Sequence, residues 1–114
     1  MIVPLRELDN PALEKLAHVT LASALMHTAD WLRDIEAARE ELADALGPEK
    51  TALVLVEDTS PIAWIAAAPA RGRIWELHPL IVDVEHWRRG HGRRLVRAIE
   101  DIARAAGDDA RRNE

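Results

Sequence analysis

A glycine-containing turn between an apolar strand and an amphipathic helix is the stretch of this sequence best suited to chemistry. The strand is predicted over residues 74–82, and the turn reads Trp-Arg-Arg-Gly-His-Gly over residues 87–92. The apolar positions of the helix recur at three- and four-residue steps, at Leu95, Ile99, Ile102 and Ala106. Gly107 is its predicted end. Unpaired backbone N–H groups and the helix dipole attract anions at such a helix start, so the turn predicts a phosphate or pyrophosphate site.

Two polar side chains interrupt the apolar strand over residues 74–82. Because side chains alternate along a strand, Glu76 and His78 share one face. A carboxylate inside an apolar strand is costly unless it is paired or hydrated. A functional site explains Glu76, and the alternative is a salt bridge to Arg71 or Arg73 at the start of the strand.

The rest of the chain supplies the elements that would hold this site in place. Residues 2–8 predict an edge strand, because Pro4 cannot lie in a central one. Asn10 is the predicted N-cap of the first helix, with Pro11 at its first position. Thr28–Asp30 offers caps for a second helix, which Gly47-Pro48 ends. Apolar helix faces span residues 13–24 and 32–46, and further strands are expected at residues 51–56 and 61–68. This order predicts an α+β fold with a mainly antiparallel sheet and flanking helices.

Two motifs of this sequence resemble the GNAT superfamily of N-acetyltransferases. Residues 88–96, Arg-Arg-Gly-His-Gly-Arg-Arg-Leu-Val, resemble the loop that binds the acetyl-coenzyme A pyrophosphate in that superfamily. Residues 75–80, Trp-Glu-Leu-His-Pro-Leu, are similar to the fourth strand of its aminoglycoside 6′-N-acetyltransferases, and residues 63–69 and 9–13 fit the same order. The resemblance covers residues 1–107, which it makes a partial GNAT domain, followed by a polar tail at 108–114.

The resemblance implies an enzyme that transfers an acetyl group from acetyl-coenzyme A to an amine. The amine it implies is the 6′-amino group of an aminoglycoside, the reaction of an antibiotic-resistance enzyme. A homodimer that takes acetyl-coenzyme A and a small cationic amine is therefore expected, with no metal. The alternative is a GNAT-fold module with impaired catalysis that binds coenzyme A or oligomerises.

The resemblance also implies roles for individual residues. Glu76 matches the acidic residue that accepts the proton of the substrate ammonium group, and His78 matches a neighbouring site histidine. The backbone N–H near Leu80 would polarise the thioester carbonyl, with Pro79 compatible with a strand distortion there. The expected cofactor-binding residues are Leu80, Ile81, Val82, Arg88, Arg89, Gly90, His91, Gly92 and Arg93. The side chain of His91 is expected to face solvent.

One position of the turn departs from the family pattern. The family prefers Arg or Gln three residues before the first glycine, and Trp87 stands there. On the substrate side, the resemblance points to Trp31 and Asp34, together with Glu76. The alternative for Trp31 is a place in the core at the start of an amphipathic helix.

Charge is divided unevenly along the chain. Residues 1–70 carry 12 acidic and 5 basic residues, whereas residues 71–104 carry 8 arginines and 5 acidic residues. This division suits a protein with one cationic and one anionic ligand, although ordinary solvated helix faces would also produce it. Nucleic-acid binding through the arginines of residues 88–97 is the least favoured class, because the chain is acidic overall and Trp87 is the only aromatic residue among them.

The composition sets outer bounds on the protein. There is no cysteine, so neither a disulfide nor a thiolate metal site can form. No apolar run approaches the ~20 residues of a membrane helix, and the first ten residues lack the core of a signal peptide. A cytoplasmic protein without a membrane partner is expected.

The C-terminal end departs most from the family. Members of the family continue with a fifth strand beside the fourth, which splays from it to admit the pantetheine arm, and with a tyrosine suited to protonating the departing thiolate. This sequence has no tyrosine, and residues 108–113 are polar and lack β-branched side chains. The expectation is a C-terminally shortened member whose strand 74–82 is an uncovered edge. Such a chain would self-associate through that edge or remain a monomer with a loosened site.

Overall fold

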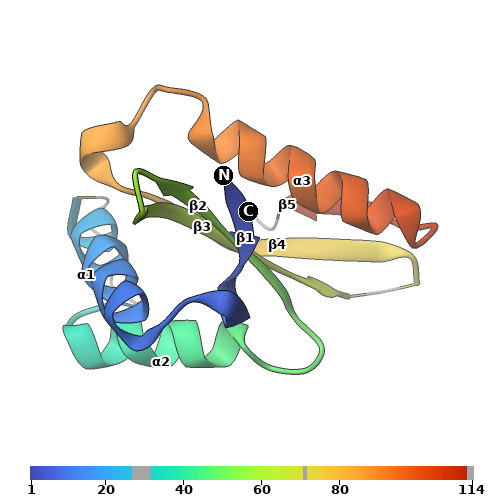
Figure 1. The fold of residues 1–114 in the computed structure, drawn as a ribbon. Coiled ribbons are helices and arrows are strands. Elements are labelled where there is room, and N and C mark those ends of the chain that lie inside the picture. Colours follow the sequence, from blue (N-terminus) through green and yellow to red (C-terminus); the bar gives the residue numbers. More distant parts are fainter. Residues whose placement is uncertain (27–31, 71, 113–114) are drawn as a thin grey trace.

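The protein folds as one five-stranded sheet with helices on both faces (Figure 1). The computed structural model describes residues 1–26, 32–70 and 72–112. The strands lie in the order of the sequence, with β1 to β4 antiparallel and β5 parallel to β4. Their bounds are β1 Ile2–Pro4, β2 Thr51–Glu57, β3 Ser60–Pro69, β4 Ile74–Val82 and β5 Asp109–Arg112. The predicted α+β class with a mainly antiparallel sheet is confirmed.

The helices divide between the two faces of the sheet. The α-helices are α1 Asn10–Met26, α2 Ile35–Ala45 and α3 His91–Ala105, and the 3-10 helices are η1 Leu5–Glu7 and η2 Val84–His86. Helices α1 and α2 lie together on one side, whereas α3 crosses the other side (Figure 1). None of the helices in the described ranges has both the length and the apolar character needed to cross a membrane.

Each face of the sheet packs its own hydrophobic core. Trp64 of β3 is fully buried on the side of α1 and α2, and its neighbour Ile65 is buried on the side of α3 against Leu95. The indole N–H of Trp64 donates to Oγ1 of Thr20 at 2.9 Å, and Thr20 donates to the carbonyl oxygen of Leu16 at 2.7 Å. These two hydrogen bonds satisfy the buried polar side-chain atoms of Trp64 and Thr20.

Strand β4 contains one more residue than β3 in the middle of their pairing. Leu77 lies opposite Ala67 and Leu80 lies opposite Ile65, so three steps along β4 match two along β3. Before the extra residue, the odd positions Trp75 and Leu77 belong to the core on the α3 side. After it, the even positions Leu80 and Val82 pack against the same core. The extra residue therefore reverses the alternation of side chains, as a β-bulge does. The distortion expected near Pro79 is confirmed, and the peptide bond between His78 and Pro79 is cis.

Three predicted element starts or ends differ from the structure. The strand expected over residues 2–8 ends at Pro4, because the chain turns into η1 and buries Leu5 in the core. Asp9 caps α1 in place of Asn10, since its carboxylate accepts the N–H of Ala12 at 2.9 Å. Asp34 caps α2 by accepting the N–H of Ala37 at 2.8 Å, and the predicted caps at 28–30 lie outside the described residues.

The prediction that strand 74–82 is an uncovered edge was wrong for its first half. Residues 109–112 form β5 and pair in parallel with Ile74–Leu77. Gly107, with φ +82°, turns the chain after α3, and the N–H of Asp109 donates to the carbonyl oxygen of Arg73 at 2.7 Å. Main-chain hydrogen bonds make this strand, so a polar sequence without β-branched residues can supply it. In the described part of the chain, β5 reaches no farther along β4 than Leu77.

Candidate active site

The glycine turn presents backbone donors at the start of α3. The helix begins at His91, and its N-cap Gly90 has the left-handed conformation, with φ 79° and ψ 10°. The first backbone hydrogen bond of the helix runs from the N–H of Arg94 to the carbonyl oxygen of Gly90, at 3.1 Å. Among the described residues, the N–H groups of His91, Gly92 and Arg93 have no protein acceptor. They are the orphan donors of a helix start, and an anion can satisfy them.

The turn packs directly against the second half of β4. A Cβ atom added to Gly92 would lie 3.4 Å from Cδ2 of Leu80 and 3.8 Å from Cγ2 of Val82. Trp87 fixes the other side of the turn, because its indole N–H donates to the carbonyl oxygen of Val82 at 2.7 Å. The structure thus brings together Leu80, Val82 and the turn. Ile81 instead points its side chain into the core on the side of α1 and α2, which leaves only its backbone for a ligand at the turn.

Basic side chains surround the donors of the turn. Arg88, Arg89 and Arg93 are all exposed. Arg88 has a positive φ of 64°, which is uncommon outside glycine, and it belongs to the same tight turn as Gly90. An anion at the turn would therefore meet backbone dipoles and exposed positive charges together.

Glu76 and His78 are exposed side chains on β4, one on each side of the last residue that pairs with β5. Glu76 lies opposite Ala68 of β3, on the face of the sheet that α1 and α2 cover. Of the two arginines proposed as structural partners, Arg73 makes no salt bridge with Glu76 within the described chain, and Arg71 lies outside it. Glu76 is thus an exposed carboxylate near the place where β4 and β5 part.

The predicted substrate residues between α1 and α2 are only partly described. Trp31 lies outside the described residues. Asp34 is exposed, and its Oδ1 atom is engaged in capping α2. No hydrogen bond or salt bridge joins Asp34 to Glu76 in the described ranges, so the structure gives Asp34 a capping role.

The side chain of His91 is buried, which corrects the expectation that it faces solvent. It is 6% exposed and its Nε2 atom lies 3.8 Å from Oε1 of Glu57, at the end of β2. The ring of His86 is 6.2 Å away, centroid to centroid. His91 precedes the buried Leu95 by four residues, so it lies on the apolar face of α3. That spacing is the signal in the sequence that could have placed His91 inside, whereas the contact with Glu57 has no such local signal.

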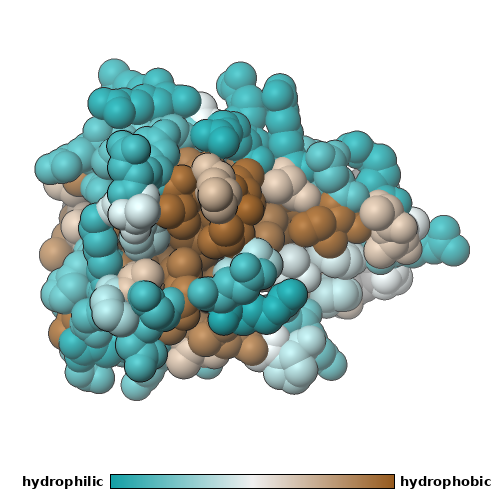
Figure 2. Space-filling model, in the orientation of Figure 1, coloured by the Kyte–Doolittle hydropathy of each residue, from teal (hydrophilic) through white to brown (hydrophobic). Residues whose placement is uncertain are grey.

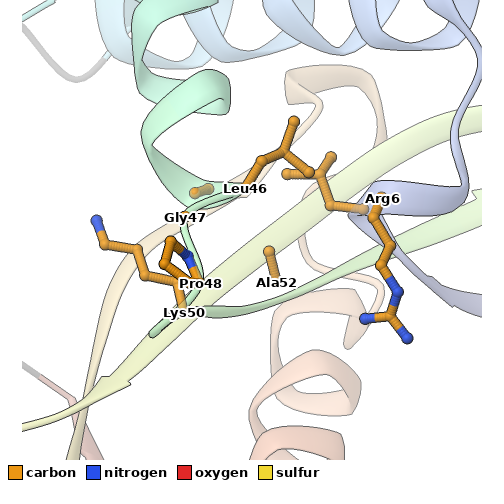
Figure 3. A pocket seen from close by; sticks show the side chains of 8 residues that line it. Arg6, Leu46, Gly47, Pro48, Lys50 and Ala52 are labelled. Carbon is orange, nitrogen blue, oxygen red and sulfur yellow. The ribbon is translucent and has the colours of Figure 1, made fainter.

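The surface has two further features, a hollow and an apolar patch. A hollow of about 210 Å³ lies between the end of α2, η1 and β2, and the cations beside it, Arg6 and Lys50, extend away from each other (Figure 3). Apolar side chains gather over the strands in the middle of one face, with hydrophilic side chains on the helices to either side (Figure 2). In the described ranges, no three His, Asp or Glu side chains are grouped to hold a metal ion.

Comparison with known proteins identifies the family. The model of the acetyltransferase (GNAT) family matches residues 12–112, and the chain belongs to this family, whose cosubstrate is acetyl-coenzyme A. No curated protein matches the sequence significantly.

Three solved structures illustrate the likeness of the fold. An aminoglycoside 6′-N-acetyltransferase complexed with coenzyme A is 24% identical, with a TM-score of 0.77 over 94% of this chain and 57% of that one. An aminoglycoside 6′-acetyltransferase type Ii is 27% identical, with a TM-score of 0.72 over 94% of this chain and 66% of that one. The ribosomal-protein-S18-alanine N-acetyltransferase from Escherichia coli is 17% identical, with a TM-score of 0.71 over 95% and 61%. The chain therefore spans 57 to 66% of the length of these enzymes.

Proposed function

We propose that this chain transfers the acetyl group of acetyl-coenzyme A to a primary amine. The observation that carries the proposal is the set of N–H groups at His91, Gly92 and Arg93 that have no acceptor in the described chain, in a turn whose Gly92 packs against Leu80 and Val82 of β4. A pyrophosphate bound there would leave the pantetheine arm to follow β4 toward the point where β5 ends, opposite Leu77. Membership of the acetyltransferase family supports this arrangement.

Glu76 is the residue that we assign to proton removal from the amine. An amine attacks a thioester only as the neutral species, so a carboxylate must accept the ammonium proton directly or through water. Glu76 is exposed beside the point where β4 and β5 part, which makes it accessible to such a substrate. His78 lies two residues farther along, and the backbone N–H near Leu80, just past the bulge, would donate to the carbonyl oxygen as it gains negative charge.

The amine that we propose is the 6′-amino group of an aminoglycoside. Two of the similar structures are enzymes of that name, although their identity to this chain is low. A polycationic sugar also matches the acidic residues 1–70 and the exposed carboxylates of Asp34 and Glu76. Trp31 would contribute an aromatic surface for a sugar ring.

A measurement of thiol release from acetyl-coenzyme A tests the activity and the substrate together. The panel pairs an aminoglycoside that has a 6′-amino group with its 6′-hydroxyl counterpart, and adds a linear polyamine and a peptide with a free N-terminus. We expect turnover with the 6′-amino compound alone. Equal rates with the 6′-hydroxyl compound, or turnover only with the polyamine or peptide, would contradict the proposed amine and leave acetyl transfer intact.

The second candidate function is binding of coenzyme A without turnover. It is favoured by the absence of tyrosine from these 114 residues, because the resemblance implies a tyrosine that protonates the departing thiolate. Saturable binding of coenzyme A without thiol release for any amine would support this candidate. A homodimer stays a prediction.

A further inference from the structure

Four ionisable side chains from three segments meet beneath the glycine turn. His91 from the start of α3 lies 3.8 Å from the carboxylate of Glu57. His86 in η2 lies beside His91, and its Nδ1 atom is 3.5 Å from Oδ2 of Asp83. Both ring nitrogens of His91 are buried, and neither has a hydrogen-bond partner among the described residues. A buried imidazole with no partner is destabilising by about 1–3 kcal/mol, so a role in binding would explain why a histidine occupies this position.

The electrostatic surroundings of His91 depend on what occupies the turn. Without a ligand, its ring lies at the positive end of the α3 dipole, close to the backbone donors and to the imidazole of His86. A pyrophosphate at the same donors would reverse the sign of the local field. A protonated His91 could then pair with Glu57, which already lies near its Nε2 atom.

Solvent can supply the proton through Glu57. The Glu57 side chain is 41% exposed, compared with 6% for His91. It also lines a surface hollow of about 730 Å³ with Met1, Val56 and residues 58–59. The carboxylate thus has one side toward His91 and another toward water.

We infer that His91 is a positioning residue of the phosphate turn that takes up a proton from solvent when a pyrophosphate group binds, and then pairs with Glu57. This inference rests on the proposed function, because it takes the pyrophosphate of coenzyme A as the ligand. The other charged groups around His91 are His86 with Asp83, and the exposed guanidinium groups of Arg88, Arg89, Arg93 and Arg94. The pairing holds the first turn of α3 to the end of β2, so it couples binding to the position of the turn.

Calorimetric titration with dephospho-coenzyme A measures the proton uptake. This probe keeps the pyrophosphate and lacks the 3′-phosphate, which would itself titrate near neutral pH. Titrations at pH 7 in two buffers of different ionisation enthalpy give the number of protons taken up. We expect the unaltered chain to take up a measurable fraction of one proton, and its affinity to fall about three- to tenfold between pH 6.5 and pH 8.5.

Variants of the chain identify the residue that takes up the proton. His91→Gln should bind without uptake and with affinity independent of pH, and Glu57→Gln should reduce the uptake. His18→Gln is the matched control, because His18 is an exposed histidine 3.5 Å from a glutamate on α1, and it should keep the full uptake. If His91→Gln does not fold, the histidine ring signals of the unaltered chain replace it. The signal of His91 should move toward its protonated position on addition of the probe at pH 7.5.

The results separate this inference from the proposed function. Binding with no proton uptake, uptake that survives in His91→Gln, or a His91 signal unmoved by the probe overturns the inference and leaves acetyl-coenzyme A as the proposed cosubstrate. Failure of both coenzyme A and its dephospho form to bind overturns the proposed function, and the inference with it.

Discussion

The indole N–H of Trp87 donates a 2.7 Å hydrogen bond to the carbonyl oxygen of Val82, the last residue of β4. Trp87 stands where the family prefers Arg or Gln, and this bond shows what the tryptophan does there. It ties the beginning of the glycine turn back to the strand against which the turn packs. An indole at this position therefore supports the geometry of the turn without a cationic side chain.

Trp87→Phe should destabilise the chain by about 0.5–1.5 kcal/mol, because the partly buried carbonyl of Val82 loses its donor while the aromatic volume is largely kept. Urea unfolding measures this change. We also expect weaker binding of coenzyme A, since the turn loses one attachment to β4. Unchanged stability and affinity would show that the bond contributes nothing to the turn.

Gly90 is required for its backbone conformation and not for space. Its φ is 79°, and a Cβ atom added there would meet nothing within 4 Å. Gly90→Val should cost at least about 1–2 kcal/mol and lower the affinity for coenzyme A, whereas Gly90→Asn should be milder because Asn tolerates the left-handed region. Calorimetry and urea unfolding on both variants test this. Equal stability and equal affinity in the two variants would show that the left-handed conformation at Gly90 is not what requires glycine.

Glu76→Gln should lower turnover by roughly 10²–10⁴-fold if Glu76 is the general base, because the amide keeps the shape and cannot accept the proton. The affinity for coenzyme A should stay unchanged, since the turn is not altered. Asp101→Asn, an exposed carboxylate on α3, is the control that should retain full turnover. A rate for Glu76→Gln equal to that of the unaltered chain at every pH would make Glu76 a surface residue only.

Trp75 and Asp108 hold β5 against β4. The indole N–H of Trp75 donates to Oδ2 of Asp108 at 3.0 Å, immediately before β5 begins. Asp108→Leu should remove a hydrogen bond to a charged group, worth about 1.5–3 kcal/mol, and expose more of the β4 edge. Hydrogen exchange of residues 74–77 should accelerate, and self-association should rise in ultracentrifugation. Protection equal to that of the unaltered chain would mean that the main-chain bonds hold β5 alone.

The contact between Glu14 and Arg39 makes the packing of α1 on α2 sensitive to acid. Arg39 donates to Glu14 at 2.6 Å through Nη2 and at 3.0 Å through Nε, and these hydrogen bonds lower the pKa of Glu14 below its ordinary value of 4.5. Because the native state then binds fewer protons than the unfolded state, the contribution of this contact to stability is present above pH 4.5. It is lost as pH falls through the lowered pKa of Glu14.

Arg39→Gln should therefore lower stability slightly at pH 7, where both groups are exposed and screened, and the difference from the unaltered chain should disappear as pH falls through the lowered pKa of Glu14. Its loss of stability with acid should be flatter by that same small amount. Thermal unfolding between pH 3 and pH 7, at low and high salt, measures this. Lys50→Gln, an exposed cation outside this contact, is the control. If the stability of Arg39→Gln fell as steeply between pH 4.5 and pH 3 as that of the unaltered chain, other carboxylates would cause the acid sensitivity.

The sequence by itself determined most of the fold. The period of 3.6 in the apolar residues located all three α-helices, and short apolar runs between turns located β2, β3 and β4, because burial leaves a direct trace in the order of apolar residues. It also located the glycine turn, since a positive φ at Gly90 and close packing at Gly92 both favour glycine. The GNAT motifs supplied the family, which the comparison confirms.

The tertiary structure alone decided which side chains meet. Residues 109–112 are mostly polar, yet they form a strand because Gly107 turns the chain and the edge of β4 offers them main-chain partners. Helix caps moved from Asn10 to Asp9 because both residue types can cap and only the local geometry selects one. His91 faces Glu57 and not solvent because α3 packs on the sheet with the face that carries His91 turned inward, toward the end of β2. Pairings of this kind join residues 34 positions apart, and no local pattern encodes the contact between them.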